Sequence, residues 1–289
     1  MRIALVGTEN SHADEIVRHL NVEQLAGDTR VVTLVGADDE RNRNLAAAGG
    51  ITRIVPTAAE LLGDLGNLGN VDALIVTNRD GALHREYAVP FLEAGVPVWV
   101  DKPLAASTAD AQAILDAAKR GGAPVTSYSA LRWVADADAL AKKAPRDLQA
   151  ITVTGPADPD SEYSGIFFYG IHAADLAQRL APGEPGPVEV ERVGSTVVVR
   201  YRCGGVLVTL QLVKPADAGR VPFHAELVGR TELVSSDVRL DSEYVVPGLR
   251  VFLKMLETRE RPLDDATMLA PITVLERTHT ILRQTVQEV

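Results

Sequence analysis

The sequence predicts an α/β fold with two parts: an N-terminal doubly wound parallel Rossmann sheet and a C-terminal α+β domain with a mainly antiparallel open sheet. Short apolar segments rich in β-branched residues alternate with helical segments as far as residue 128. After about residue 149, segments alternate apolar and polar residues, which is typical of half-buried strands. We therefore expect a Rossmann-type dinucleotide-binding domain over residues 1–128 and a substrate-binding and oligomerisation domain over residues 129–289.

In the first half, strands buried in a parallel sheet should be apolar on both faces. The segments that meet this condition are residues 2–7, 31–38, 71–77, 96–100 and 123–129. The clearest helices between them cover residues 82–94 and residues 108–119, and Ser107 can cap the second. A sheet of this kind binds its ligand beyond the carboxyl ends of its strands.

In the second half, strands are expected from a hydrophobic period of two residues. They cover residues 187–193, 196–202 and 206–212, followed by the segments FHAELVG and TELVSS. Cys203-Gly204-Gly205 joins two of these strands as a hairpin. We expect helices on one face of this antiparallel sheet, with the other face free for a partner.

Composition disfavours several classes of protein. Of the 289 residues, 46% are hydrophobic and 24% are charged, which suits two globular cores. The net charge of −10 disfavours nucleic acid and anionic membranes as partners. Cys203 is the only cysteine, which excludes an intrachain disulfide and a thiolate metal cluster. The first residues are unlike a signal peptide, and no apolar run approaches the ~20 residues of a membrane span, so we expect a soluble, cytoplasmic protein.

The turn after the first expected strand is where a dinucleotide-binding fold places its GxGxxG sequence. Its first glycine is Gly7, but Glu9 and His12 occupy the second and third glycine positions. They add bulk and a carboxylate where a phosphate would approach. Two interpretations stay open: a modified cofactor pocket, or a helix that is simply capped by Asn10 or Ser11.

Asp38 ends the second expected strand and is followed by Asp39, about where an acidic residue receives the ribose hydroxyls of adenosine. Alternatively, one of them caps the helix that begins near Arg41. If a cofactor binds, Asp38 favours NAD over NADP.

Lys102 is the first candidate for chemistry. Asp101, Lys102 and Pro103 come just past the strand at residues 96–100, in the crevice where ligands of such a sheet lie. A lysine there can donate hydrogen bonds to a hydroxyl or a carbonyl. A solvated loop residue is the alternative.

His172 and Asp175 are three residues apart in a helical segment, so they share a face of the helix. A histidine titrates near neutral pH, so it could act with Lys102 to position and deprotonate a carbinol. Alternatively, His172 is a satisfied core histidine and Asp175 pairs with Arg179. The carboxylates and histidines do not cluster at metal-ligand spacing, so we expect no metal.

The segment VDALIVTNRDGALHREYAVPFLEAGVPVWVDKPLA resembles the strand, helix and E-K-P segment of the Gfo/Idh/MocA oxidoreductases, which include inositol dehydrogenases. Gly170, His172 and Asp175 are similar to the family's G-x-H-x-x-D signature, and the resemblance covers nearly the whole chain. It implies catalytic roles for Lys102 and His172, a cis bond before Pro103, and burial of the free sheet face against another subunit.

Together, position and resemblance give the expected cofactor-binding residues: Gly7, Thr8, Glu9, His12, Asp38, Thr77, Asn78, His84, Asp101, Lys102 and Pro103. Of these, His84 is expected to shape the crevice. The resemblance also places Tyr128, Arg132 and Trp133 toward a substrate, although a role at a domain interface is equally open. Asp101 stands where the family usually has a glutamate, and Phe168 stands where many members carry an acidic residue, so it cannot transfer a proton.

We therefore expect an oxidoreductase that moves a hydride between NAD or NADP and a carbinol carbon of a sugar, cyclitol or polyol. His172 would take the hydroxyl proton, Lys102 would polarise the oxygen, and Asp175 would hold a neighbouring hydroxyl. The alternative is a catalytically silent relative that binds a sugar-like or nucleotide-like ligand, which Glu9, His12 and Phe168 motivate.

Overall fold

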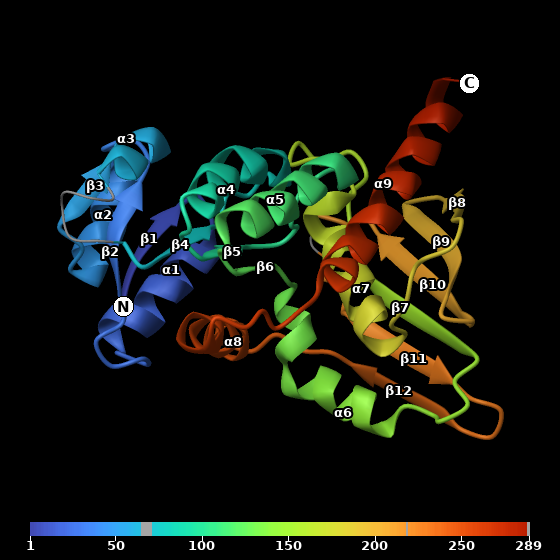
Figure 1. Ribbon diagram of the computed structural model, residues 1–289. Helices are drawn as coiled ribbons and strands as arrows, with labels where there is room; N and C mark the ends of the chain where they lie inside the picture. The colour runs from blue at the N-terminus through green and yellow to red at the C-terminus, as the bar shows by residue number, and fades with distance from the viewer. Residues whose placement is uncertain (65–70, 218, 288–289) are drawn as a thin grey trace. The chain divides into compact units, whose positions relative to one another are not determined.

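The structure is a computed structural model that describes residues 1–64, 71–217 and 219–287 (Figure 1). Its contacts divide the chain into two compact units. The first unit comprises Met1–Asp101, Ala109–Ser127 and Val245–Leu263, and the second comprises Lys102–Thr108, Tyr128–Tyr244 and Asp264–Val289. Among the described residues, no helix combines the length and the apolar character that crossing a membrane would require.

The first unit is built on a six-stranded sheet in the order β3-β2-β1-β4-β5-β6, in which neighbouring strands are parallel. The strands are β1 (Arg2–Val6), β2 (Arg30–Val35), β3 (Arg53–Val55), β4 (Ala73–Val76), β5 (Val98–Val100) and β6 (Val125–Thr126). This order is that of a doubly wound Rossmann sheet, whose direction of winding reverses between β1 and β4. The expected parallel fold is confirmed. The short edge strand β3 was not among the expected strands.

Helices connect these strands and are seen around the sheet in Figure 1. They are α1 (Ser11–Val17), the π-helix η1 (Arg18–Val22), α2 (Glu40–Gly49), α3 (Ala58–Gly63), the 3-10 helix η2 (Gly81–Leu83), α4 (His84–Glu93), α5 (Thr108–Gly121) and, from far along the chain, α8 (Val245–Thr258). The Asp39 carboxylate caps α2 by accepting from the backbone N–H of Asn42 at 2.8 Å. Gly50, at φ 61°, ends this helix in the left-handed conformation.

The apolar face of α8 attaches this helix to the first unit. Phe252 is fully buried, and its ring centroid lies 5.5 Å from that of Trp99 in β5. The sequence-based boundary at residues 128/129 places α8 in the second domain, whereas its contacts place it in the first unit. An amphipathic stripe reveals that a helix is packed on one face but not which core it packs against.

The second unit is built on a six-stranded sheet in the order β12-β11-β7-β10-β9-β8. Its strands are β7 (Ala150–Pro156), β8 (Glu189–Val193), β9 (Thr196–Cys203), β10 (Val206–Val213), β11 (His224–Val228) and β12 (Leu233–Asp237). Among the described strands of this sheet, only the β7–β10 pair is parallel, so the expectation of a mainly antiparallel sheet is confirmed. The expected hairpin joins β9 to β10, with Gly204 and Gly205 at φ 56° and 89°.

Helices cover one face of this second sheet (Figure 1). The unit contains the 3-10 helix η3 (Ala130–Trp133), α6 (Ala135–Lys143), α7 (Phe167–Leu180) and α9 (Asp265–Gln287). Gly170 lets α7 pack closely, because an added Cβ would lie 3.6 Å from Leu212 of β10 and 3.3 Å from Leu275 of α9. Along β10, Val208 and Leu210 face this core, while Leu207 and Gln211 lie on the opposite, exposed face.

Candidate active site

A cavity of about 650 Å³ lies in the first unit at the carboxyl ends of β1, β2, β3 and β4. Its lining comes from the β1–α1 loop, the end of β2, the start of α3 and the β4–α4 segment. Of the expected cofactor residues, Gly7, Thr8, Glu9 and Asn78 line this cavity. Its position is the one where a doubly wound sheet binds a nucleotide.

Gly7 lets the turn after β1 lie directly against the backbone of Asn78. Its φ of 82° favours glycine, and an added Cβ would lie only 2.2 Å from the backbone nitrogen of Asn78. The Thr77 hydroxyl lies 3.0 Å from the carbonyl oxygen of Val6 and 2.5 Å from that of Gly7. These hydrogen bonds of Thr77 therefore stabilise the turn after β1.

The two residues at the missing glycine positions each have a partner in the first unit. The Glu9 carboxylate accepts from the backbone N–H of Arg79 at 2.7 Å, and the Arg79 side chain donates to the Glu9 carbonyl at 2.7 Å. His12 Nδ1 lies 2.6 Å from a carboxylate oxygen of the buried Asp101. Asp101, which is shorter than the family's usual glutamate, therefore lies against His12, which occupies the third glycine position.

The helix after this turn begins at Ser11, and Asn10 is its N-cap. The Asn10 side chain accepts from the backbone N–H of His12 at 2.8 Å. The capping interpretation is thus correct for Asn10, and the turn still borders the cavity through Thr8 and Glu9. Capping and a modified pocket are compatible in this structure.

The acidic residue that lines the cavity at the end of β2 is Asp39, which also caps α2. The Asp38 side chain is 71% exposed and lies 3.3 Å from Arg43. Asp39, and not the expected Asp38, is therefore the aspartate placed to contact a ribose in this cavity. A single sequence cannot distinguish two adjacent aspartates, because the strand end is uncertain by a residue or two.

The cavity has features that suit a nucleotide. Its volume lies within the range of about 300–1,000 Å³ that is usual for small-molecule sites. The buried side-chain oxygen of Asn78 has no hydrogen-bond partner among the described residues, so it can accept a bond from a ligand. The Arg41 guanidinium supplies positive charge, and its hydrogen bond with Asp14 raises its pKa above the usual value.

His84 begins α4 and is fully buried. Its Nε2 lies 2.8 Å from the carbonyl oxygen of Asn78, so the ring contacts the segment that lines the cavity. This contact suits the crevice-shaping role expected for His84.

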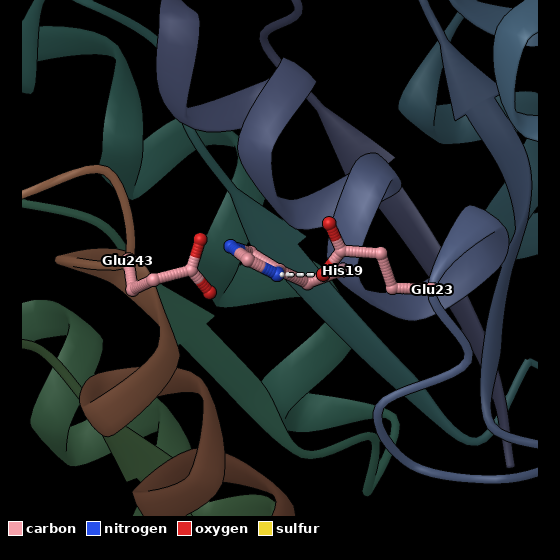
Figure 2. Close-up of side chains that lie close together, drawn as sticks. All are labelled: His19, Glu23 and Glu243. Atoms are coloured by element: carbon pink, nitrogen blue, oxygen red, sulfur yellow. Dashed lines mark hydrogen bonds and ion pairs between the residues drawn. The ribbon is translucent and has the colours of Figure 1, made fainter.

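A further histidine, His19, is fully buried in the first unit and lies in the π-helix after α1. Its Nδ1 lies 2.7 Å from the Glu23 carboxylate, and Figure 2 shows this bond. The hydrogen bond to His19 lowers the pKa of the Glu23 carboxyl below its usual value. Glu243, also drawn in Figure 2, belongs to the second unit.

Lys102 belongs to the second unit and contacts the start of α7. Its ammonium nitrogen lies 5.1 Å from the centroid of the Phe168 ring, a cation–π contact. Phe168 and His172 are four residues apart in α7, so Lys102 lies against the same helix face, one turn before His172. The peptide bond between Lys102 and Pro103 is cis.

His172 is buried and surrounded by rings and a hydroxyl. Its ring centroid lies 5.8 Å from that of Tyr169 and 5.4 Å from that of Phe223. Its Nδ1 lies 2.7 Å from the Ser129 hydroxyl oxygen. Ser129 was not among the expected site residues, because nothing in its local sequence distinguishes it from a turn serine.

Asp175 forms a buried ion pair with Arg132, not with Arg179. The Arg132 guanidinium donates to both Asp175 oxygens at 2.7–3.1 Å, and the backbone N–H of Ser129 donates to one of them at 2.9 Å. The Arg179 side chain instead contacts Asp138. The Arg179 alternative for Asp175 is wrong because η3 supplies Arg132, whose side chain is more completely buried than that of Arg179.

Comparisons with known proteins give a consistent picture. Residues 1–129 match a family model described as an oxidoreductase family with an NAD-binding Rossmann fold. Inositol 2-dehydrogenase 2 of Saccharopolyspora erythraea is 26% identical over 257 residues, which cover 81% of this chain and 73% of the relative.

Two solved structures share the fold over almost their whole lengths. A dehydrogenase from Chromobacterium violaceum has a TM-score of 0.81 at 20% identity and covers 100% of this chain and 97% of its own. GenD2 from gentamicin A biosynthesis, solved in complex with NAD, has a TM-score of 0.80 at 18% identity and covers 97% of this chain and 93% of its own.

Proposed function

We propose that this chain is a member of the Gfo/Idh/MocA oxidoreductases, whose family model matches its residues 1–129, and that it is an NAD(P)-dependent dehydrogenase acting on a sugar, cyclitol or polyol. The nicotinamide would exchange a hydride with the carbinol carbon of the substrate. The residues of the chain bind and orient the substrate oxygen, and the hydroxyl proton is exchanged at the pair formed by Lys102 and His172.

The contact of Lys102 with Phe168 is the observation that carries this proposal. The lysine of one motif and the histidine of the other come from segments about 70 residues apart in the chain, yet both lie on the same face of α7. A lysine donor and an imidazole within one helical turn suit the orientation of a single carbinol oxygen.

We assign Asp175 a positioning task in this proposal. Its oxygens are engaged by Arg132 and by the backbone of Ser129, and that arrangement fixes the segment that contacts His172. The earlier expectation, that Asp175 holds a substrate hydroxyl, stays a prediction.

NAD is the preferred cofactor in this proposal. The Asp39 carboxylate borders the cavity at the end of β2, where it would attract ribose hydroxyls and repel the additional phosphate of NADP. The proposed holder residues are Gly7, Thr8, Asn78 and this aspartate. We also propose a cytoplasmic location, since the one cysteine of the chain suits a reducing compartment.

Cofactor binding is tested by thermal or denaturant unfolding of the whole chain with NAD and, separately, with NADP. A ligand at ~100 times its dissociation constant adds about 2.7 kcal/mol to the free energy of unfolding. We expect stabilisation by NAD at lower concentrations than by NADP. If neither NAD nor NADP stabilised the chain, the result would contradict the proposal.

The same measurement decides what Glu9 and His12 do. The double variant Glu9→Gly, His12→Gly removes a carboxylate that lines the cavity, so we expect it to lower the dissociation constant for NAD by about tenfold, or 1.4 kcal/mol. Glu93→Gln is the matched control, because Glu93 pairs with Arg120 and does not line the cavity.

A silent relative that only binds a ligand is the second candidate. Phe168 favours it, because a ring stands beside Lys102 where many family members carry an acid that can accept a proton. Stabilisation by NAD without any hydride transfer would favour this candidate.

A further inference from the structure

Ser129 has three hydrogen bonds that meet at the start of η3. Its side chain is fully buried. Its hydroxyl oxygen accepts from the backbone N–H of Leu131 at 3.1 Å and lies 2.7 Å from Nδ1 of His172. Its own backbone N–H donates to Asp175 at 2.9 Å, which fixes the position of the serine.

The hydroxyl of Ser129 has one proton to donate. A buried hydroxyl proton is costly to leave without an acceptor. The Leu131 N–H is a donor and cannot receive it, whereas an unprotonated Nδ1 of His172 can. When Ser129 donates to Nδ1, the serine proton has an acceptor and the Nδ1 lone pair of His172 has a donor.

The ring nitrogens of neutral histidine are linked: when Nδ1 accepts, Nε2 carries the hydrogen. We propose that Ser129 is a positioning residue that holds neutral His172 in the Nε2–H tautomer, so that the ring presents a hydrogen-bond donor to the substrate oxygen. This inference rests on the proposed function for its consequence, but the tautomer itself exists without cofactor or substrate.

The proposal changes the part that His172 plays. The expected removal of a hydroxyl proton needs a lone pair on Nε2, which belongs to the opposite tautomer. In that tautomer Nδ1–H would donate to Ser129, whose oxygen already accepts from Leu131, and the serine proton would have no acceptor among the described residues. In the neutral resting state His172 is therefore a hydrogen-bond donor to the substrate oxygen, and it can take the hydroxyl proton only after the hydrogen on Nε2 has moved.

The tautomer is measured directly by NMR of the whole chain labelled with ¹⁵N-histidine, without ligand, at about pH 8.5, well above the usual histidine pKa of about 6.5. Two-bond ¹⁵N–¹H correlations identify the protonated nitrogen of each ring. The His172 signals are assigned through contacts with the Phe223 ring, 5.4 Å away, so the assignment needs no variant. We expect Nε2–H. A predominant Nδ1–H form, or a ring still charged at this pH, would overturn the proposal.

Variants then test whether Ser129 is the cause. Ser129→Ala removes the donor, so an Nδ1–H population should appear, while Ser129→Thr keeps a hydroxyl and should retain the Nε2–H form. Ser161→Ala is the matched control: Ser161 likewise accepts from the backbone N–H two residues later, at 3.3 Å, but does not contact His172. An unchanged tautomer in Ser129→Ala would refute the assignment. Failure to transfer a hydride would leave these spectra unaffected and would count against the proposed function alone.

Discussion

At the scale of single residues, the departures from the glycine fingerprint are each matched by a partner within the first unit. Glu9 contacts Arg79, and His12 contacts Asp101. The sequence shows that the glycines are missing and that Asp101 stands for a glutamate. It does not show that His12 and Asp101 meet, because they are 89 residues apart and only the fold brings them together.

The ion pair of Arg132 with Asp175 is a second case in which the partner is set by the fold. Its side chains are only 6% and 5% exposed. Removing one partner leaves a buried charge uncompensated, which costs about 3–5 kcal/mol. We therefore expect Asp175→Asn to lower the free energy of unfolding by an amount in this range in a denaturant titration.

Asp138→Asn is the control for that prediction. Asp138 also contacts an arginine, Arg179, but its side chain is 48% exposed, so its loss should cost at most about 1 kcal/mol. Equal losses in the two variants would show that burial of the Arg132 pair does not matter for stability.

At the scale of elements, hydrophobic periodicity predicted most of the strands and the hairpin of β9 and β10. It missed β3 and β7. The three residues of β3 are too few to display a period. β7 does alternate buried and half-buried residues such as Ile151 and Thr152, so its sequence carries the period-two signal of a strand. Periodicity also gave no sign that α8 returns to the first unit.

The buried face of β9 gives a prediction about pH. Tyr201 is 4% exposed, and burial raises the pKa of its phenol above the usual value of 10.0. The folded chain then binds more protons than the unfolded chain, so stability is complete below the unfolded pKa and falls as pH rises beyond it. We expect the free energy of unfolding to decline from about pH 10 upward.

Tyr201→Phe should flatten this decline, as measured by denaturant titrations between about pH 8 and pH 11. A Tyr201→Phe variant with an undiminished slope would contradict the assignment of the decline to this phenol.

At the scale of the whole molecule, composition and alternation predicted the fold class, and a few motif residues indicated the resemblance to an oxidoreductase family. They could not show which groups contact Lys102 and His172. Phe168 contacts Lys102, and Ser129 contacts His172. Both contacts join α7 to segments that are distant in the sequence. The contacts within the site therefore depend on tertiary packing, whereas the fold class follows from local sequence patterns.

Assembly is the prediction that belongs to the exposed face of the second sheet. Leu207 is 38% exposed there, beside exposed Gln211. We expect a homo-oligomer that buries this face, with at least twice the 30.9 kDa mass of one chain in light scattering.

Leu207→Asp should shift that mass toward the monomer, because a carboxylate is costly to bury in an interface. Leu240→Asp is the matched control, since Leu240 is equally exposed, at 38%, but lies outside the strands. A 30.9 kDa mass for the wild type across micromolar concentrations would contradict the prediction.

Hydride transfer itself tests the central claim most directly. The whole chain is mixed with NAD and a panel of cyclitols, sugars and polyols, and the absorbance of the reduced nicotinamide is followed, with Lys102→Met as the comparison. We expect reduced nicotinamide with at least one carbinol substrate, and a loss of at least about a hundredfold in kcat/KM in Lys102→Met, or 2.7 kcal/mol, while stabilisation by NAD persists. A chain that NAD stabilises but that forms no reduced nicotinamide with any member of the panel, or a Lys102→Met variant as active as the wild type, would contradict the account.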